Sequence, residues 1–95
     1  MRESQSVAMR LREKLQRHFN PVELIVIDES AQHAGHAGAR QGGESHFRVR
    51  IVSVDFAGAS RVERQRRVYS VVKDEISAGL HALALTTLTP DEANR

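Results

Sequence analysis

The stretch SHFRVRIVSV, residues 45–54, alternates apolar with polar side chains. Its apolar positions are Phe47, Val49 and Ile51, and the positions between and before them carry His46, Arg48 and Arg50. Successive side chains of an extended chain point to opposite faces. The pattern therefore predicts a strand with one face in the core and one polar face.

The preceding segment supplies a partner for this strand. Residues 22–28 are rich in β-branched side chains, which favours a second strand. The two strands are expected to pair as an antiparallel hairpin. Residues 29–44 between them hold four glycines and two histidines, which predicts a long loop. Loops of this length in small domains are usually functional or disordered.

Two helices are expected on either side of the hairpin. Residues 3–19 place Val7, Leu11 and Leu15 on one stripe, which is typical of an amphipathic helix. Residues 61–77 form the second helix, which Ser60 can cap and Gly79 can end. Its expected inward positions are Val68, Val71, Val72 and Ile76.

A third strand is expected at residues 80–86, parallel to residues 45–54 because a helix connects the two. Thr89-Pro90-Asp91-Glu92 has the form of a capping box with proline at the first helical position. A short helix should start there. The order is αββααβα or αββαβα, an α+β fold of two layers with a three-stranded mixed sheet and its helices on one face.

Length and composition fit one domain, residues 1–95, with 40% hydrophobic and 27% charged residues. The net charge of +2 does not by itself require a nucleic-acid partner. The chain has no cysteine, which excludes disulfides and thiolate ligands. Residues 1–10 contain no apolar signal region, and the longest apolar run, residues 24–27, is too short for a membrane span. We expect a cytoplasmic protein without membrane attachment.

Histidine is the unusual chemical feature. Five occur, at His18, His33, His36, His46 and His81. Neutral imidazole is a common ligand for transition metals, so a loop histidine paired with His81 could form a two-ligand site. The alternative is a set of exposed loop histidines and one buried, hydrogen-bonded His81. His18 and His46 are expected to be structural or at the surface.

Basic residues are the second feature, and they concentrate on the expected helix at residues 61–77 and on the polar face of residues 45–54. The candidate set for nucleic acid is Arg48, Arg50, Arg61, Arg64, Arg67 and Lys73. Acidic residues interrupt the helix at Glu63, Asp74 and Glu75. The pattern fits a solvated face, and also a docking surface for an acidic partner or a phosphate backbone.

No catalytic set emerges, and we expect no enzymatic activity. Ser45 and His46 are adjacent in a strand and face opposite sides, so they cannot pair as nucleophile and base. Gly35-His36-Ala37-Gly38 matches the GxxG clamp of KH domains, but here it joins two strands instead of two helices.

Taken together, several short motifs resemble the BolA family over nearly the whole chain. They are Asp28-Glu29-Ser30, His33, Glu44-Ser45-His46-Phe47, Val52-Ser53, Phe56-Ala57-Gly58, Arg64 to Arg67, His81-Ala82-Leu83-Ala84-Leu85 and Thr89-Pro90. The resemblance implies an αββααβα fold similar to a class II KH domain. The chain departs from the family at Arg64-Gln65-Arg66, where relatives often have Arg-His-Arg.

The resemblance also implies a function. BolA-like proteins form heterodimers with monothiol glutaredoxins and share a [2Fe–2S] cluster with them, for cluster trafficking or iron and redox sensing. The partner brings a cysteine and a glutathione thiol. The ligands implied here are His81 and a loop histidine, His33, with His36 as the alternative. The free protein is expected to be a monomer.

Two other functions remain open. BolA-like proteins are also described as DNA-binding transcriptional regulators, and a metal-free interaction scaffold is the third class. A cluster adapter needs His33 or His36 close to His81. A DNA binder needs its basic residues, Arg48, Arg61, Arg64 and Arg67, on one continuous face. A scaffold needs only an exposed apolar patch.

Overall fold

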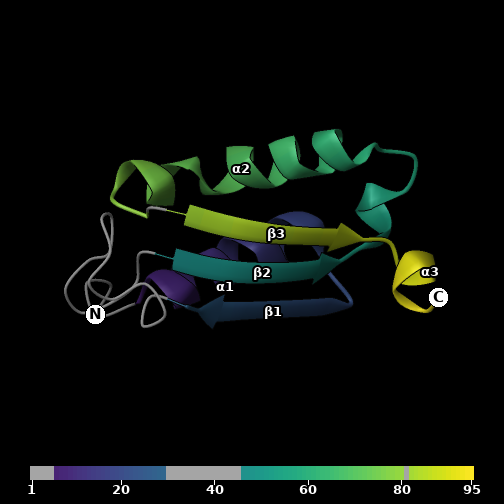
Figure 1. Ribbon diagram of the computed structural model, residues 1–95, viewed down its shortest axis with the longest axis horizontal. Coiled ribbons are helices and arrows are strands. Elements are labelled where there is room, and N and C mark those ends of the chain that lie inside the picture. The colour runs from purple at the N-terminus through teal and green to yellow at the C-terminus, as the bar shows by residue number, and fades with distance from the viewer. Residues whose placement is uncertain (1–5, 30–45, 81) are drawn as a thin grey trace.

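The structure is a computed structural model, and it describes residues 6–29, 46–80 and 82–95. Its elements follow one another as three helices, three strands and one 3₁₀ turn (Figure 1). They are α1 (Val7–Phe19), β1 (Glu23–Asp28), β2 (His46–Val52), η3 (Val54–Phe56), α2 (Arg61–Ser77), β3 (Ala82–Leu88) and α3 (Pro90–Ala93). The 3₁₀ turn η3 stands where the longer of the two expected orders has an extra helix. The predicted loop at residues 29–44 lies almost entirely outside the described residues.

The sheet is mixed, as predicted. β2 lies in the centre, antiparallel to β1 and parallel to β3. The crossover from β2 to β3 runs through α2. β3 begins and ends two residues later than expected, because its ladder follows β2 along its whole length and draws Thr87 and Leu88 into pairs with Ile51 and Val52.

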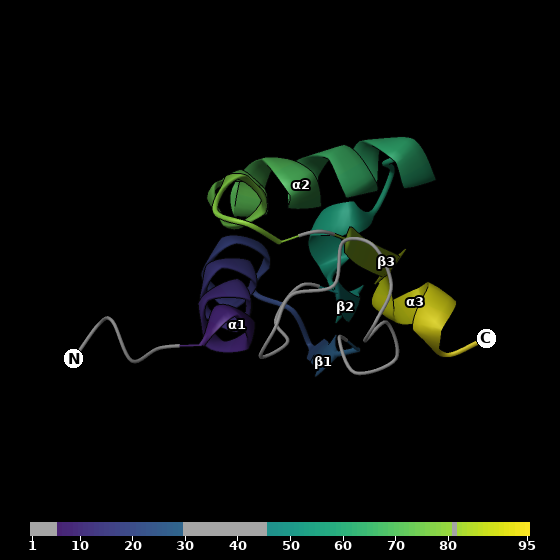
Figure 2. The ribbon, with the colours of Figure 1, turned by 60° about the vertical axis from the view of Figure 1, so that its left-hand side comes forward.

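The helices α1 and α2 cover one face of the sheet (Figure 2). The period-two pattern of β2 is confirmed, since Phe47, Val49 and Ile51 are buried beneath them. The core is completed by side chains from the two helices, the 3₁₀ turn and the segment before β3, chiefly Leu11, Leu15, Phe19, Phe56, Val68, Val72 and Leu80. Phe56, which ends the 3₁₀ turn η3, is fully buried. The other face of the sheet carries Ile25, Arg48, Arg50 and Ala84 in adjacent rows.

The prediction for the inner face of α2 is wrong at one position. Ile76 is 37% exposed, whereas the neighbouring Glu75 is 6% exposed. The Glu75 carboxylate accepts hydrogen bonds from Arg10 (3.0 Å) and Lys14 (2.8 Å) of α1. A buried carboxylate is tolerable when it is paired and hydrogen-bonded, and α1 supplies both cations.

Local signals in the sequence correctly give the starts of α2 and α3 and the ends of α1 and α2. The predicted start of the first helix at residue 3 is wrong, because Ser6 is extended and caps α1, which begins at Val7. Ser60 and Glu63 form a reciprocal capping box at the start of α2, and Thr89 with Glu92 forms another at α3. Asn20 ends α1 in the left-handed conformation, and Gly79 follows α2 with φ of 131°. Within the described residues, no helix has the length and apolar character to cross a membrane.

Candidate functional site

Three chain positions meet at the end of the sheet where β2 and β3 begin. His46 opens β2 and is the register partner of Ala82, which opens β3. The backbone N–H of Glu29, just past β1, donates to the carbonyl of His46 at 2.8 Å. Residues 29 and 46 flank the segment that carries His33 and His36, and Ala82 follows His81 in the sequence. The attachment points of all three candidate ligands therefore lie at one end of the sheet (Figure 1).

The candidate ligands themselves, His33, His36 and His81, lie outside the described residues. Of the two described histidines, only His46 lies at this end of the sheet. His46 is 8% exposed at the start of β2. His18 sits at the end of α1, and the carbonyl of the next residue, Phe19, accepts from Ser53 just past the end of β2. His18 and His46 thus lie at opposite ends of the sheet. Among the residues that the structure describes, no three His, Asp or Glu side chains gather as a metal site.

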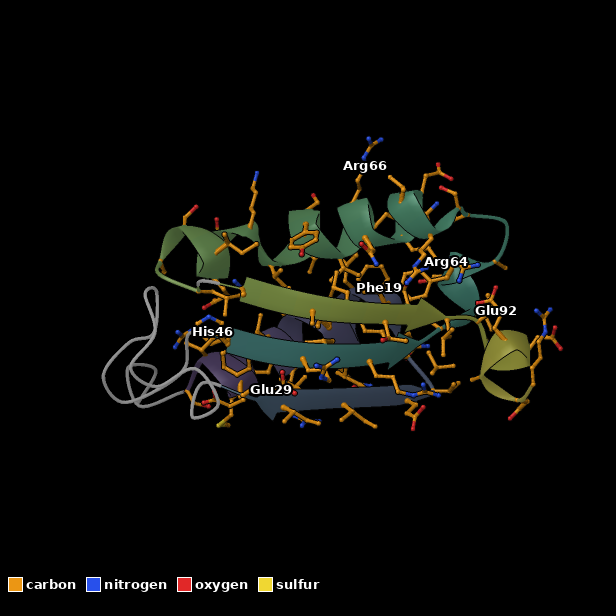
Figure 3. The ribbon with its side chains drawn as sticks, viewed as in Figure 1. Phe19, Glu29, His46, Arg64, Arg66 and Glu92 are labelled. Atoms are coloured by element: carbon orange, nitrogen blue, oxygen red, sulfur yellow. The ribbon has the colours of Figure 1, made fainter. Side chains whose placement is uncertain are left out.

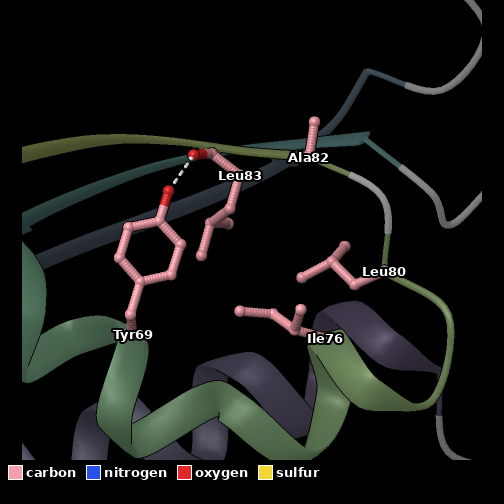
Figure 4. Close-up of a pocket in the computed structure, with 5 residues that line it drawn as sticks. All are labelled: Tyr69, Ile76, Leu80, Ala82 and Leu83. Carbon is pink, nitrogen blue, oxygen red and sulfur yellow. Dashed lines mark hydrogen bonds between the residues drawn. The ribbon is translucent and has the colours of Figure 1, made fainter.

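An apolar pocket of about 290 Å³ lies beside this end of the sheet, between α2 and β3. Its lining is Tyr69, Ile76, Leu80, Ala82 and Leu83 (Figure 4). The Tyr69 hydroxyl donates to the carbonyl of Leu83 at 3.0 Å. This hydrogen bond holds the Tyr69 ring over the start of β3. Sequence reasoning missed this pocket because it assigned Ile76 to the core. The positions of Tyr69 and Ile76, seven residues apart on one helix, were the available signal.

The predicted nucleic-acid set is split between two sides of the molecule. Arg48 and Arg50 lie on the open face of the sheet, where Arg48 donates to Glu29 (2.8 Å) and Arg50 to Glu23 (2.9 Å). The hydrogen bond from Arg48 to Glu29 raises the pKa of that guanidinium. Because both guanidinium groups already pair with carboxylates, they attract a phosphate backbone less strongly than the sequence suggests.

The remaining members of the set lie on α2, against the other face. Arg61 and Lys73 are exposed, and Arg67 donates to the carbonyl of Asp55 at 3.0 Å. Arg64 is 9% exposed and points toward Glu92 (Figure 3). The condition set for a DNA binder, one continuous basic face that includes Arg48, is not met. The helix α2 packs on the side of the sheet that Arg48 does not occupy, and Arg64 is turned inward.

A family model described as BolA-like protein matches residues 15–92 of the chain. The chain belongs to the BolA-like family. This BolA-like protein is 50% identical to Protein BOLA1, chloroplastic, of Arabidopsis thaliana over 88 residues, which cover 90% of the chain and 55% of that relative. It is 46% identical to the DNA-binding transcriptional regulator BolA of Escherichia coli over 83 residues, 87% of the chain and 75% of that protein.

The fold comparison agrees. The solved BolA domain of SufE1 from Arabidopsis thaliana superposes with a TM-score of 0.83 at 50% identity, and the match covers 93% of this BolA-like protein and 96% of that domain. The chain thus spans about half the length of the plant BOLA1 relative and nearly all of an excised BolA domain. The expected α+β fold and family are both confirmed.

Proposed function

We propose that this BolA-like protein is a non-enzymatic iron–sulfur adapter that shares a [2Fe–2S] cluster with a monothiol glutaredoxin. Its ligands are His81 and a histidine of the loop, His33, with His36 as the alternative. The observation that carries the proposal is the meeting of Glu29, His46 and Ala82 at one end of the sheet. A loop anchored there needs no change in the sheet to approach the residue before Ala82.

The chemistry of the donor set supports a histidine-ligated cluster. The chain has no cysteine, so its share of the ligands must come from imidazole or carboxylate groups. Imidazoles that replace thiolates on one iron make the cluster less negative and raise its reduction potential, as in Rieske centres. When bound, the cluster would supply one-electron chemistry, and the protein would supply the ligands that tune it.

The apolar pocket supports a partner at the same end. Tyr69 and Ile76 are 39% and 37% exposed beside Ala82, and aromatic and aliphatic side chains of this kind are common anchors in protein interfaces. A partner that also ligates the cluster would have to contact this end of the sheet. The described residues that line the pocket carry no charged side chain.

The test is anaerobic assembly of the heterodimer from this protein, a monothiol glutaredoxin, glutathione, iron and sulfide, followed by visible absorption and circular dichroism. We expect His81→Ala to abolish the histidine-type cluster spectrum, while far-ultraviolet circular dichroism of the free protein is unchanged. His33→Ala should weaken the signal, with His36 substituting in part. His18→Ala is the matched control, because His18 lies at the other end of the sheet. An unchanged cluster spectrum in His81→Ala would show that His81 is not a ligand, and the metal-free scaffold would then need to be tested as the alternative.

A DNA-binding role is the second candidate. The Escherichia coli relative carries the name DNA-binding transcriptional regulator. In the described part of this chain, Arg61, Arg66 and Lys73 of α2 are exposed and form no ion pair with a carboxylate. Free surface cations of this kind attract a phosphate backbone without reading its sequence. The split of the basic residues limits how strong such binding can be.

A further inference from the structure

A groove of about 400 Å³ runs between the end of α1 and the middle of α2, away from the candidate cluster site. His18 and Phe19 line it from α1, and α2 contributes Arg66, Arg67, Ser70 and Val71. Among the described residues, no carboxylate lines this groove. Its lining therefore combines two guanidinium groups with a hydroxyl and an imidazole.

The groove has an apolar floor that holds its shape. Phe19 is 3% exposed and its ring packs against Phe56, with ring centroids 5.2 Å apart. The His18 ring meets Phe19 edge-on at 5.3 Å. On α2, residues four positions apart lie on the same face, so Arg66 stands above Ser70 along one wall. The polar groups are thus carried by two packed helices instead of a loose loop.

The two arginines have donors to spare. In the part of the chain that the structure describes, Arg66 makes no hydrogen bond or ion pair, and it extends from α2 away from the sheet (Figure 3). Arg67 uses one terminal nitrogen on the Asp55 carbonyl, which fixes its side chain and leaves its other N–H groups available.

The acids nearest in sequence do not occupy these donors. Glu63 lies one turn before Arg67, and its carboxylate accepts from the N–H of Ser60 at the cap of α2. Asp74 lies one turn beyond Ser70 and is exposed. The side chain of Asp55 is exposed too, and only its backbone carbonyl meets Arg67. The groove keeps a net positive charge.

A second arginine-lined hollow on the molecule provides a contrast. Arg61, Arg64 and Arg95 line it, but Glu92 lines it as well. The Glu92 carboxylate accepts hydrogen bonds from both terminal nitrogens of Arg64, at 2.6 and 3.0 Å. An anion entering there would have to displace an internal carboxylate, whereas an anion entering the groove at Arg66 would not.

We propose that the groove between α1 and α2 binds a phosphate group. Guanidinium groups present paired N–H donors that match phosphate oxygens, and both Arg66 and Arg67 line the groove. The Ser70 hydroxyl and a ring N–H of His18 supply further donors at the rim. The phosphate can belong to a small molecule or to a nucleic-acid backbone, and the same donors serve both.

The first experiment titrates the cluster-free protein with sodium phosphate, at an ionic strength held constant with sodium chloride, and follows backbone amides by ¹H–¹⁵N NMR. We expect saturable shifts at His18 and at Arg66 to Val71. Arg66→Ala should weaken binding by roughly fivefold to tenfold, the loss of one charged hydrogen-bonding group at an exposed site. Lys73→Ala removes the same charge from the same helix outside the groove, and should change the affinity less than twofold.

Three results would overturn the proposal: shifts that do not saturate, shifts centred away from the groove, or equal weakening by Arg66→Ala and Lys73→Ala. The NMR spectrum of each variant reports its fold in the same measurement. Because the protein carries no cluster in this experiment, the result is independent of the iron–sulfur proposal.

Parallel titrations separate the two sources of phosphate. One uses a short DNA duplex without terminal phosphates, and another uses a nucleoside monophosphate. Duplex binding that Arg66→Ala weakens more than Lys73→Ala supports the groove and assigns it to a nucleic-acid backbone. Binding of the monophosphate and inorganic phosphate alone, with the same order of variants, supports it as a small-molecule site. Failure of all three probes to bind overturns the proposal.

Discussion

The guanidinium of Arg64 joins four segments of the chain. It donates to the carbonyl of Ala59 in the turn before α2 (2.9 Å), to the carbonyl of Thr87 at the end of β3 (3.1 Å), and to the carboxylate of Glu92 in α3. Its charge and its five N–H donors make it suited to a nearly buried junction. Arg64, which the sequence analysis placed in a nucleic-acid surface, therefore has a structural role: it links α2 to the turn before it, to β3 and to α3.

The Arg64–Glu92 pair predicts a specific acid sensitivity. Hydrogen bonds from Arg64 and from the Thr89 backbone lower the pKa of Glu92 from 4.5 to about 2. A carboxylate whose pKa is lowered by folding stabilises the fold fully above its unfolded pKa, and this contribution is lost as the pH falls through the folded value. We expect the Tm of the wild type to fall more steeply than that of Glu92→Gln between pH 5 and about pH 2.

Thermal melts followed by circular dichroism at a series of pH values measure this difference. Asp91→Asn is the control, because it removes a neighbouring carboxylate whose ion pair with Arg95 is exposed to solvent. Glu75 adds acid sensitivity in both proteins: burial favours its neutral form, but the hydrogen bonds from Lys14 and Arg10 outweigh burial and lower its pKa. Parallel curves for wild type and Glu92→Gln would contradict the role given to Arg64.

At the scale of elements, α2 holds the edge strand β3 by side chain to backbone contacts. Tyr69 donates to the carbonyl of Leu83 near the start of β3, and Arg64 to that of Thr87 near its end. Both carbonyls point away from β2, along the edge where another strand could pair. Exposed strand edges invite pairing with other chains, so these contacts protect β3 from strand addition.

The start of α2 should depend on its capping box. The Ser60 hydroxyl accepts from the N–H of Glu63 at 3.1 Å, and the Glu63 carboxylate accepts from the N–H of Ser60 at 3.2 Å. We expect Ser60→Ala to lower the free energy of unfolding by about 1 kcal/mol, and Ser60→Gly by only a few tenths. Urea denaturation measures both. Ser77→Ala, at the exposed last position of α2, is the control. An equal loss of unfolding free energy in Ser77→Ala would contradict the assignment of Ser60 as the helix cap.

At the scale of the whole molecule, the sheet separates two groups of cations. Arg48 and Arg50 lie on the open face and pair with Glu29 and Glu23. Arg61, Arg66 and Lys73, which form no ion pair within the described part of the chain, lie on α2 behind the other face. A straight duplex cannot lie along both groups at once. These two groups therefore cannot add their phosphate contacts on one straight duplex.

This separation predicts weak, salt-sensitive DNA binding without sequence preference. Fluorescence anisotropy with a labelled duplex should show affinity falling roughly tenfold to fiftyfold between 50 and 200 mM salt, as expected for about three phosphate contacts. Arg61→Ala with Lys73→Ala should weaken binding more than Arg48→Ala with Arg50→Ala. Low-nanomolar, sequence-selective binding at physiological salt would reject this prediction and promote the regulator function.

The sequence by itself determined the features that depend on neighbouring residues. The alternation in residues 45–54 placed Phe47, Val49 and Ile51 in the core, and the caps at Ser60 and Thr89 located the starts of α2 and α3. These signals are local because strand alternation and helix capping involve side chains only a few positions apart.

Only the tertiary structure decided which charged residues are buried. It also decided at which end of the sheet the segments that carry the candidate ligands are attached. Arg10 and Glu75 are 65 positions apart, and Arg64 and Glu92 are 28 apart, so no local pattern distinguishes them from solvated charges. The meeting of Glu29, His46 and Ala82 likewise follows from strand order and register. Such pairings depend on how the chain folds back on itself, because two ions distant in the sequence become partners only when the packed elements bring them together.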